Sequence, residues 1–143
     1  LLAEDAIAAL FGELLPLADV LTPNLPEAEA LLGRPIRSAR DCRAAGADLL
    51  ALGARGVLLK GGHAAGREVV DRYFDADGML EVRHPRLPAE GHGTGCTLAS
   101  AIAAELAKGR APRRAVRLAV AYVHRALARG YRPGRGAARV LEH

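Results

Sequence analysis

Three observations in the amino-acid sequence predict an α/β fold with a mostly parallel sheet and an added antiparallel hairpin. Segments with the apolar spacing of amphipathic helices alternate along the chain with short apolar segments typical of strands. The run Val57-Leu58-Leu59-Lys60 is apolar up to its last residue, as expected of a strand covered on both faces. Asp77-Gly78 separates two more strand-like segments, and this dipeptide favours the tight turn of a hairpin.

In the first part of the chain, proline and glycine mark where each expected element ends. The expected elements are a helix over Leu2–Leu15, a strand over Ala18–Thr22, a short helix over Glu27–Leu32 with Pro26 at its first position, and a helix over Ala39–Leu52. Pro16 and Pro23 end the first helix and the strand, because proline has no N–H to donate. Ser38 is a favourable N-cap, while Gly33 and Gly53 suit the left-handed backbone at helix ends.

The second part of the chain predicts three strands followed by two helices. These are strands Val57–Lys60, Val69–Asp75 and Met79–Arg83, a helix from Gly93-Thr94-Gly95 to about Lys108, and a helix beginning at Pro112. The last helix has an apolar stripe opposite a face of arginines, which is typical of a helix packed on a core. The stripe consists of Val116, Ala119, Val120, Val123 and Leu127. The tail 130–143 is rich in Gly and Arg and has no assigned element.

Composition argues against nucleic acid or a membrane as the partner. The net charge is +4, the arginines are scattered, and only 3% of the 143 residues are aromatic, so few side chains can stack on bases. No apolar run is long enough for a membrane helix, and no signal-peptide pattern is present, so the cytoplasm is the expected location. Cys42 and Cys96 form no CxxC motif, which makes a disulfide framework or a cysteine-ligated zinc site improbable. The chain begins with Leu1 rather than Met, which suggests a piece of a longer protein.

Three polar segments are expected at one edge of the sheet. They are Thr22–Glu27 after the first strand, Lys60–His63 after the second, and Gly91–Thr97 at the start of a helix. Ligands of open α/β sheets bind outside the carboxyl ends of the strands. The sequence therefore predicts a ligand site at this edge.

The segment Gly93-Thr94-Gly95-Cys96-Thr97 has the features of an anion site. Closely spaced glycines allow backbone N–H groups to turn inward, and the start of a helix adds partial positive charge. The spacing matches neither a Walker loop nor a GxGxxG motif, and such a segment can equally be a simple turn. A helix N-terminus favours the thiolate of Cys96, although Cys96 can also be a small apolar residue.

Lys60 is the strongest candidate for a phosphate contact. All but two of the 20 basic residues are Arg, and the compact ammonium of Lys60 suits a crowded strand end. Lys108 lies near a helix end and is explained by the helix dipole. Glu27 either assists Mg²⁺ through water or favours the first turn of its helix. His63 and His92 follow glycines and are either solvated or catalytic.

Taken together, these segments resemble the hydroxymethylpyrimidine/phosphomethylpyrimidine kinases of thiamine biosynthesis, in the ribokinase-like superfamily. The resemblance rests on Thr22-Pro23-Asn24-Leu25-Pro26-Glu27, Val57-Leu58-Leu59-Lys60-Gly61-Gly62-His63 and His92-Gly93-Thr94-Gly95-Cys96-Thr97-Leu98. It implies a three-layer α/β/α fold and transfer of the ATP γ-phosphate to 4-amino-5-hydroxymethyl-2-methylpyrimidine and then to its monophosphate. The family's domain is roughly twice this length. Residues 1–143 would thus be the C-terminal part of one kinase domain, without the N-terminal half that carries most of the pyrimidine pocket.

The resemblance also implies roles for individual residues. Gly93, Thr94, Gly95 and Cys96 would form an anion hole, with Cys96 as the catalytic base and a contact to the substrate. The ATP phosphates would be bound by Lys60, Asn24, Glu27, Gly61 and Thr97, and Glu27 would also organise Mg²⁺ through water. The expected partners are ATP, Mg²⁺ and the small pyrimidine, and the full-length protein is expected to be a homodimer. The isolated 143 residues are expected to be inactive and to bind the pyrimidine poorly.

One departure and three alternatives accompany this resemblance. Glu90-Gly91 stands where the family usually has Asn or Asp followed by Thr, which removes a hydroxyl that would brace the loop. Pyridoxine or pyridoxal kinases share the fold, and a non-catalytic nucleotide-binding relative fits the same segments. A Cys–His hydrolase or transferase built on Cys96 would leave Lys60 and the Asn24–Glu27 segment without a role.

Overall fold

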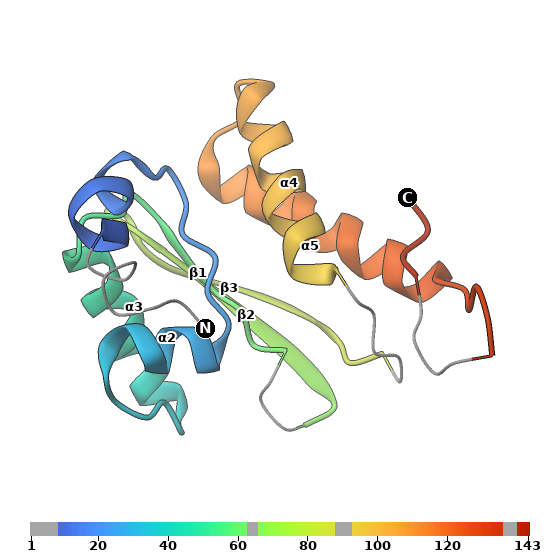
Figure 1. Ribbon diagram of the computed structural model, residues 1–143, viewed down its shortest axis with the longest axis horizontal. Coiled ribbons are helices and arrows are strands. Elements are labelled where there is room, and N and C mark those ends of the chain that lie inside the picture. Colours follow the sequence, from blue (N-terminus) through green and yellow to red (C-terminus); the bar gives the residue numbers. More distant parts are fainter. Residues whose placement is uncertain (1–8, 63–65, 88–92, 136–139) are drawn as a thin grey trace. The chain divides into compact units, whose positions relative to one another are not determined.

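The computed structural model describes residues 9–62, 66–87, 93–135 and 140–143. The chain forms two compact units, residues 1–83 and residues 84–143, and each is described by itself. Their helices and strands, labelled in Figure 1, agree with the predicted α/β class.

The first unit opens with a helical turn that differs from the prediction at its end. A π-helical turn over Leu10–Leu14 leads into a 3₁₀ turn over Leu15–Leu17. Pro16 was expected to end the helix but lies inside the 3₁₀ turn. Proline is tolerated there because the first positions of a helical turn need no N–H partner. Residues 2–8 of the expected helix lie outside the described residues.

Helices α2 (Leu25–Leu32) and α3 (Ala39–Ala51) each begin with a pair of reciprocal hydrogen bonds in the first turn. In α2, the Asn24 side chain accepts the Glu27 N–H at 2.8 Å, and Glu27 Oε2 accepts the Asn24 N–H at 2.7 Å. This capping box starts α2 at Leu25, one residue before the predicted first position at Pro26. Ser38 caps α3 as predicted, and Gly33 closes α2 with a left-handed φ of 64°.

The three strands form one sheet in the order β1 (Val57–Leu59), β2 (Glu68–Asp75) and β3 (Gly78–Pro85). β1 runs antiparallel to β2, with Val57 opposite Phe74. β2 and β3 make the predicted hairpin, and Gly78 after the turn has a φ of 100°. All three residues of β1 are buried, as its apolar run predicted.

Within the described residues, the chain has less parallel strand pairing than the sequence predicted. Leu21 donates its N–H to the Gly56 carbonyl and accepts the Leu58 N–H, in the pattern of a parallel ladder. The Pro23 carbonyl accepts the Lys60 N–H at 2.9 Å, but Pro23 has no N–H for the intervening rung. The predicted strand is therefore an extended segment with two isolated parallel bridges, Leu21–Val57 and Asn24–Lys60.

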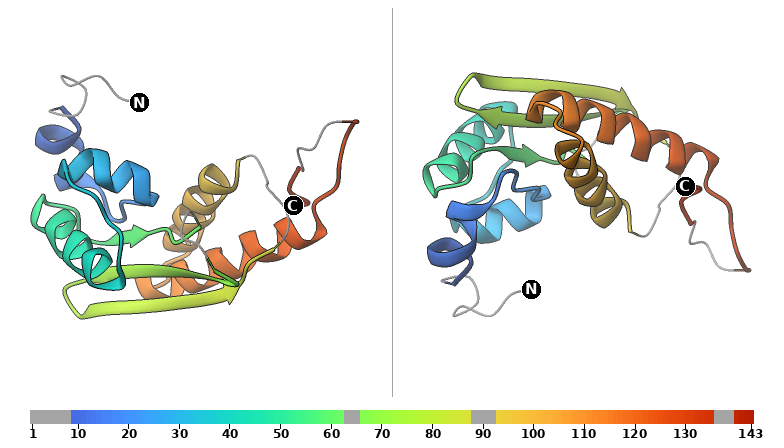
Figure 2. Two further views of the ribbon diagram at one scale, coloured as in Figure 1. Left: turned by 90° about the horizontal axis from the view of Figure 1, so that it is seen from below. Right: turned by 90° about the horizontal axis from the view of Figure 1, so that it is seen from above.

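Helix α3 packs against β1 and β2, and α2 packs against α3 (Figure 2). The buried side chains of this core include Leu15, Ala28, Ala45, Leu49, Val57, Leu59 and Phe74. Gly46 of α3 faces the Phe74 ring, whose nearest atom would lie 2.3 Å from a Cβ at position 46. A glycine inside the helix thus allows the aromatic ring to approach.

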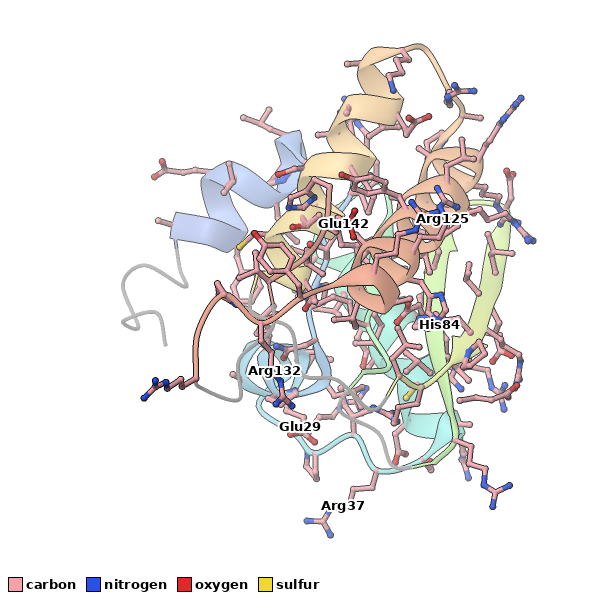
Figure 3. All side chains as sticks on the ribbon, turned by 90° about the vertical axis from the view of Figure 1, so that its right-hand side faces the viewer. Glu29, Arg37, His84, Arg125, Arg132 and Glu142 are labelled. Carbon is pink, nitrogen blue, oxygen red and sulfur yellow. The ribbon has the colours of Figure 1, made fainter. Side chains whose placement is uncertain are left out.

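The second unit is built on a pair of helices, α4 (Thr94–Ala107) and α5 (Pro112–Arg129), which pack side by side (Figure 1). Both begin at the predicted residues, and Val116, Ala119 and Val120 of the predicted stripe are buried. Leu141 of the tail is also buried. His84, labelled in Figure 3, makes an edge contact with His124 of α5, with ring centroids 4.9 Å apart.

Many of the arginines lie on the surface. Arg37 is exposed after α2 and extends away from the ribbon in Figure 3, and Arg132 is exposed in the tail. Among the described residues, no helix is both long and apolar enough to cross a membrane.

Candidate functional site

The first part of the candidate site lies where the segment before α2 meets the end of β1. The parallel bridge between Asn24 and Lys60 places the two predicted segments side by side. The Lys60 ammonium lies 3.7 Å from Glu27 Oε2, and its side chain is 19% exposed. An ammonium held at the N-terminus of α2, with its stem largely covered, is suited to bind an anion at this edge.

Asn24 and Glu27 also have a structural role that the sequence analysis did not assign. Their side chains close the capping box of α2, so both polar groups are already hydrogen-bonded to backbone. The spacing Asn-x-x-Glu is itself the sequence signal of a capping box, and it accounts for Glu27 better than the helix dipole alone.

Gly61 follows Lys60 in a tightly enclosed position. Its N–H donates to Asp71 Oδ1 of β2 at 2.8 Å, and Asp71 is only 5% exposed. A Cβ at position 61 would lie 2.2 Å from the Val70 carbonyl oxygen, which is too close for any side chain. The turn after Lys60 is therefore pressed against the backbone of β2.

Replacing Gly61 by Ala is expected to lower the free energy of unfolding by about 1–3 kcal/mol, because the new methyl group must displace the β2 backbone. Chemical denaturation of the two proteins measures this difference. Gly62→Ala is the matched control, since a Cβ there meets nothing within 4 Å. Equal stability of the two variants would contradict the close approach of Gly61 to β2.

Asp71 was not identified as a site residue from the sequence. It lies on β2 between Val69 and Tyr73, both buried, at a position where strand alternation predicts an apolar side chain. A carboxylate at an inward position of a strand is the signal that would have drawn attention to it.

The second part of the candidate site is the N-terminus of α4 in the second unit. Gly93 is the N-cap with a left-handed φ of 81°, and the helix begins with Thr94, Gly95 and Cys96. The Thr97 N–H donates to the Gly93 carbonyl at 2.9 Å, which makes it the first N–H inside the helical ladder. No side chain caps this end among the described residues. The N–H groups of Thr94, Gly95 and Cys96 therefore have no partner inside the α4 ladder, as at the start of any α-helix.

The two cysteines occupy opposite environments. Cys96 is exposed and, with Thr97, lines a groove of about 680 Å³ along α4 and α5. Cys42 is buried in the first unit, where burial raises the pKa of its thiol. Cys42 is therefore an inert residue of the core, whereas Cys96 is accessible to a reactant.

Lys108 needs no ligand to explain it. It is the C-cap of α4, and its ammonium lies 2.8 Å from Glu105 Oε1. Lys108 and the nearby Arg110 hold the pKa of the Glu105 carboxyl below its usual value. An ion pair with Glu105 thus adds to the interaction of Lys108 with the helix dipole.

The candidate residues therefore fall into two groups. Asn24, Glu27, Lys60 and Gly61 come together in the first unit, and Gly93–Thr97 form the start of α4 in the second. His63, His92 and Glu90-Gly91 lie outside the described residues.

Glu27 fits a supporting role toward Mg²⁺ but not a complete metal site. The described residues hold no group of three His, Cys, Asp or Glu side chains that would bind a metal ion. One Glu27 oxygen already accepts the Asn24 N–H and has the Lys60 ammonium nearby. Such a carboxylate suits contact with Mg²⁺ through water, with phosphate oxygens as the direct ligands.

Comparison with known proteins identifies the family. A family model described as Phosphomethylpyrimidine kinase matches residues 1–141. The chain belongs to this family. The match confirms the resemblance drawn from the three motif segments.

Individual relatives with similar sequences carry names that match this family. A hydroxymethylpyrimidine/phosphomethylpyrimidine kinase of Rhizobium meliloti is 49% identical over 130 residues, covering 89% of this chain and 48% of the relative. The chloroplastic thiamine biosynthetic bifunctional enzyme TH1 of Arabidopsis thaliana is 48% identical over 130 residues, covering 88% of this chain and 25% of the relative. The chain thus spans about half the length of the first relative and a quarter of the second.

A solved structure confirms the fold of this chain. Pyridoxal kinase of Staphylococcus aureus in complex with AMP-PCP superposes with a TM-score of 0.90 at 33% sequence identity, covering 97% of this chain and 52% of that one. The predicted ribokinase-like α/β class is therefore confirmed.

Proposed function

We propose that this chain is the ATP-binding, C-terminal part of a kinase that phosphorylates 4-amino-5-hydroxymethyl-2-methylpyrimidine and then its monophosphate. The observation that carries the proposal is the meeting of Lys60 with the Asn24–Glu27 segment, in a chain of this family. The residues missing from the chain, relative to its longer relatives, would supply most of the pyrimidine pocket.

In the proposed reaction, Lys60 binds the phosphates of ATP together with Gly61, Asn24 and Thr97. The hydroxyl oxygen of the pyrimidine attacks the γ-phosphorus, the bond from that phosphorus to the β-phosphate oxygen breaks, and ADP leaves. The N–H groups at Gly93–Cys96 stabilise the charge on the transferred phosphoryl group. Cys96, as thiolate, accepts the proton of the attacking hydroxyl.

Mg²⁺ and a second protein copy complete the proposal. Mg²⁺ bound with ATP neutralises phosphate charge, and Glu27 would contact it through water. We propose a homodimer and a cytoplasmic location for the complete protein.

A second substrate class is favoured by the structural comparison. The AMP-PCP complex named above is a pyridoxal kinase, and its nucleotide supports ATP as the phosphate donor here. Pyridoxine is therefore the alternative acceptor for the same site.

ADP release by the complete protein tests these alternatives. We expect kcat/KM for the hydroxymethylpyrimidine to exceed that for pyridoxine at least about tenfold, the factor that corresponds to about 1.4 kcal/mol. The reverse preference would assign the vitamin B6 substrate. Nucleotide binding without turnover of either acceptor would indicate a non-catalytic relative, and acyl transfer without ATP would indicate a Cys–His enzyme. The 143-residue chain alone is expected to show no turnover.

A further inference from the structure

A buried carboxylate lies directly behind the end of β1. Asp71 occupies an inward position of β2 and is 5% exposed, between the buried Val69 and Tyr73. Burial of a carboxylate costs free energy unless hydrogen bonds compensate it, and an apolar residue would fill this position at lower cost. The hydrogen bonds of Asp71 therefore indicate why a carboxylate, and not an apolar side chain, occupies this position.

One of those contacts is made to the turn that follows Lys60. Asp71 Oδ1 accepts the Gly61 N–H at 2.8 Å. On the other side, the Pro23 carbonyl accepts the N–H of Lys60 itself at 2.9 Å. The backbone of Lys60 is consequently held by hydrogen bonds at two successive N–H groups, one to each neighbouring segment.

The absence of a side chain at position 61 makes the hydrogen bond from the Gly61 N–H to Asp71 possible. The Gly61 backbone lies against β2 so closely that a Cβ would be 2.7 Å from the Val70 carbonyl carbon. Gly61 and Asp71 thus act as a matched pair, with the glycine allowing the approach and the carboxylate fixing it.

We propose that Asp71 is a positioning residue that sets the location of the Lys60 ammonium for contact with the phosphates of ATP. The inference rests on the proposed function of Lys60. Lysine carries its charge at the end of a long, flexible stem, so a small rotation of its backbone moves the ammonium substantially. A displacement of about 1 Å in a positioned group can cost about 100-fold in rate.

The proposed role predicts a selective kinetic effect in the complete protein. Asp71→Ala is expected to lower kcat/KM for ATP by about tenfold, a factor of about 1.4 kcal/mol, while KM for the pyrimidine stays within about twofold. Asp71→Asn keeps an oxygen acceptor for the Gly61 N–H and is expected to restore most of this loss. An Asn variant as impaired as the Ala variant would contradict the hydrogen-bonding role.

Tyr73→Phe is the matched control for stability. Tyr73 is buried on the same strand, two residues further along, and the variant also removes one polar group. It is expected to leave KM for ATP unchanged at temperatures where the Tyr73→Phe and Asp71→Ala proteins are fully folded. Equal losses of kcat/KM for ATP in the two variants would show that Asp71 acts only through general stability, and would overturn the proposal.

A double-mutant cycle with Lys60→Ala separates this inference from the proposed function. Because Asp71 acts through Lys60, adding Asp71→Ala to the Lys60→Ala protein is expected to change kcat/KM for ATP no further. ADP affinity, measured by calorimetry on the same four proteins, should show the same pattern. Additive losses would overturn the positioning role. Unchanged ATP kinetics in Lys60→Ala alone would instead refute the proposed phosphate contact.

Discussion

Lys60→Ala is expected to lower kcat/KM for ATP by about 100-fold in the complete protein, because a charge-assisted contact to phosphate is worth roughly 1.5–3 kcal/mol. The Lys60 stem is largely covered, and its ammonium lies 3.7 Å from Glu27 Oε2 in the first turn of α2, so its charge is held at this edge. Lys60→Arg is expected to recover only part of the loss, since a planar guanidinium fits poorly at a crowded strand end.

Stability should change little in the Lys60→Ala protein. Glu27 is about half exposed and still accepts the Asn24 N–H, so loss of this ion pair costs at most about 1 kcal/mol. Lys108→Ala is the matched control, because it removes the other lysine, which is paired with Glu105 at the far end of α4. Wild-type ATP kinetics in Lys60→Ala would exclude the phosphate role, as would an equal loss in Lys108→Ala.

Cys96→Ala is expected to lower kcat by about 100-fold or more, the usual contribution of a positioned proton acceptor. Cys96 is exposed at the first turn of α4, so its truncation leaves no cavity and should not alter unfolding. An aspartate carboxylate at this position can also accept a proton, far better than a methyl group or a neutral hydroxyl. Cys96→Asp is therefore expected to retain more activity than Cys96→Ala or Cys96→Ser.

Steady-state rates with saturating ATP and pyrimidine measure this effect. Ser100→Ala is the matched control, because Ser100 lies one turn further along α4 and lines the same groove. If Cys96→Ala keeps the wild-type kcat, the thiol is not the proton acceptor, and the anion hole of backbone N–H groups alone would carry the proposed catalysis.

Much of the fold could be predicted because its boundaries depend on local chemistry. Gly109 and Pro112 separate α4 from α5, and Gly78 marks the hairpin, since these residues restrict or extend the backbone wherever they occur. The three motif segments likewise led to the kinase family, because their residue types and spacing are specific.

Other features could not be predicted because they depend on distant parts of the chain. Pro16 does not end a helix, because a 3₁₀ turn accommodates it at a position that needs no N–H. Pro23 divides the parallel pairing with β1, an effect visible only once the partner carbonyls are known. The capping role of Glu27 was available in the sequence, but its proximity to Lys60 depends on the bridge between two segments.

The sequence by itself determined the family, the α/β class, and the residue types at the candidate site, because glycine, proline and compact polar motifs act through short-range backbone chemistry. Only the tertiary structure decided that Lys60 lies beside Asn24 and Glu27, and that the buried carboxylate of Asp71 holds the Gly61 N–H. These contacts join segments ten or more residues apart, and they form only when the strands pair and exclude water.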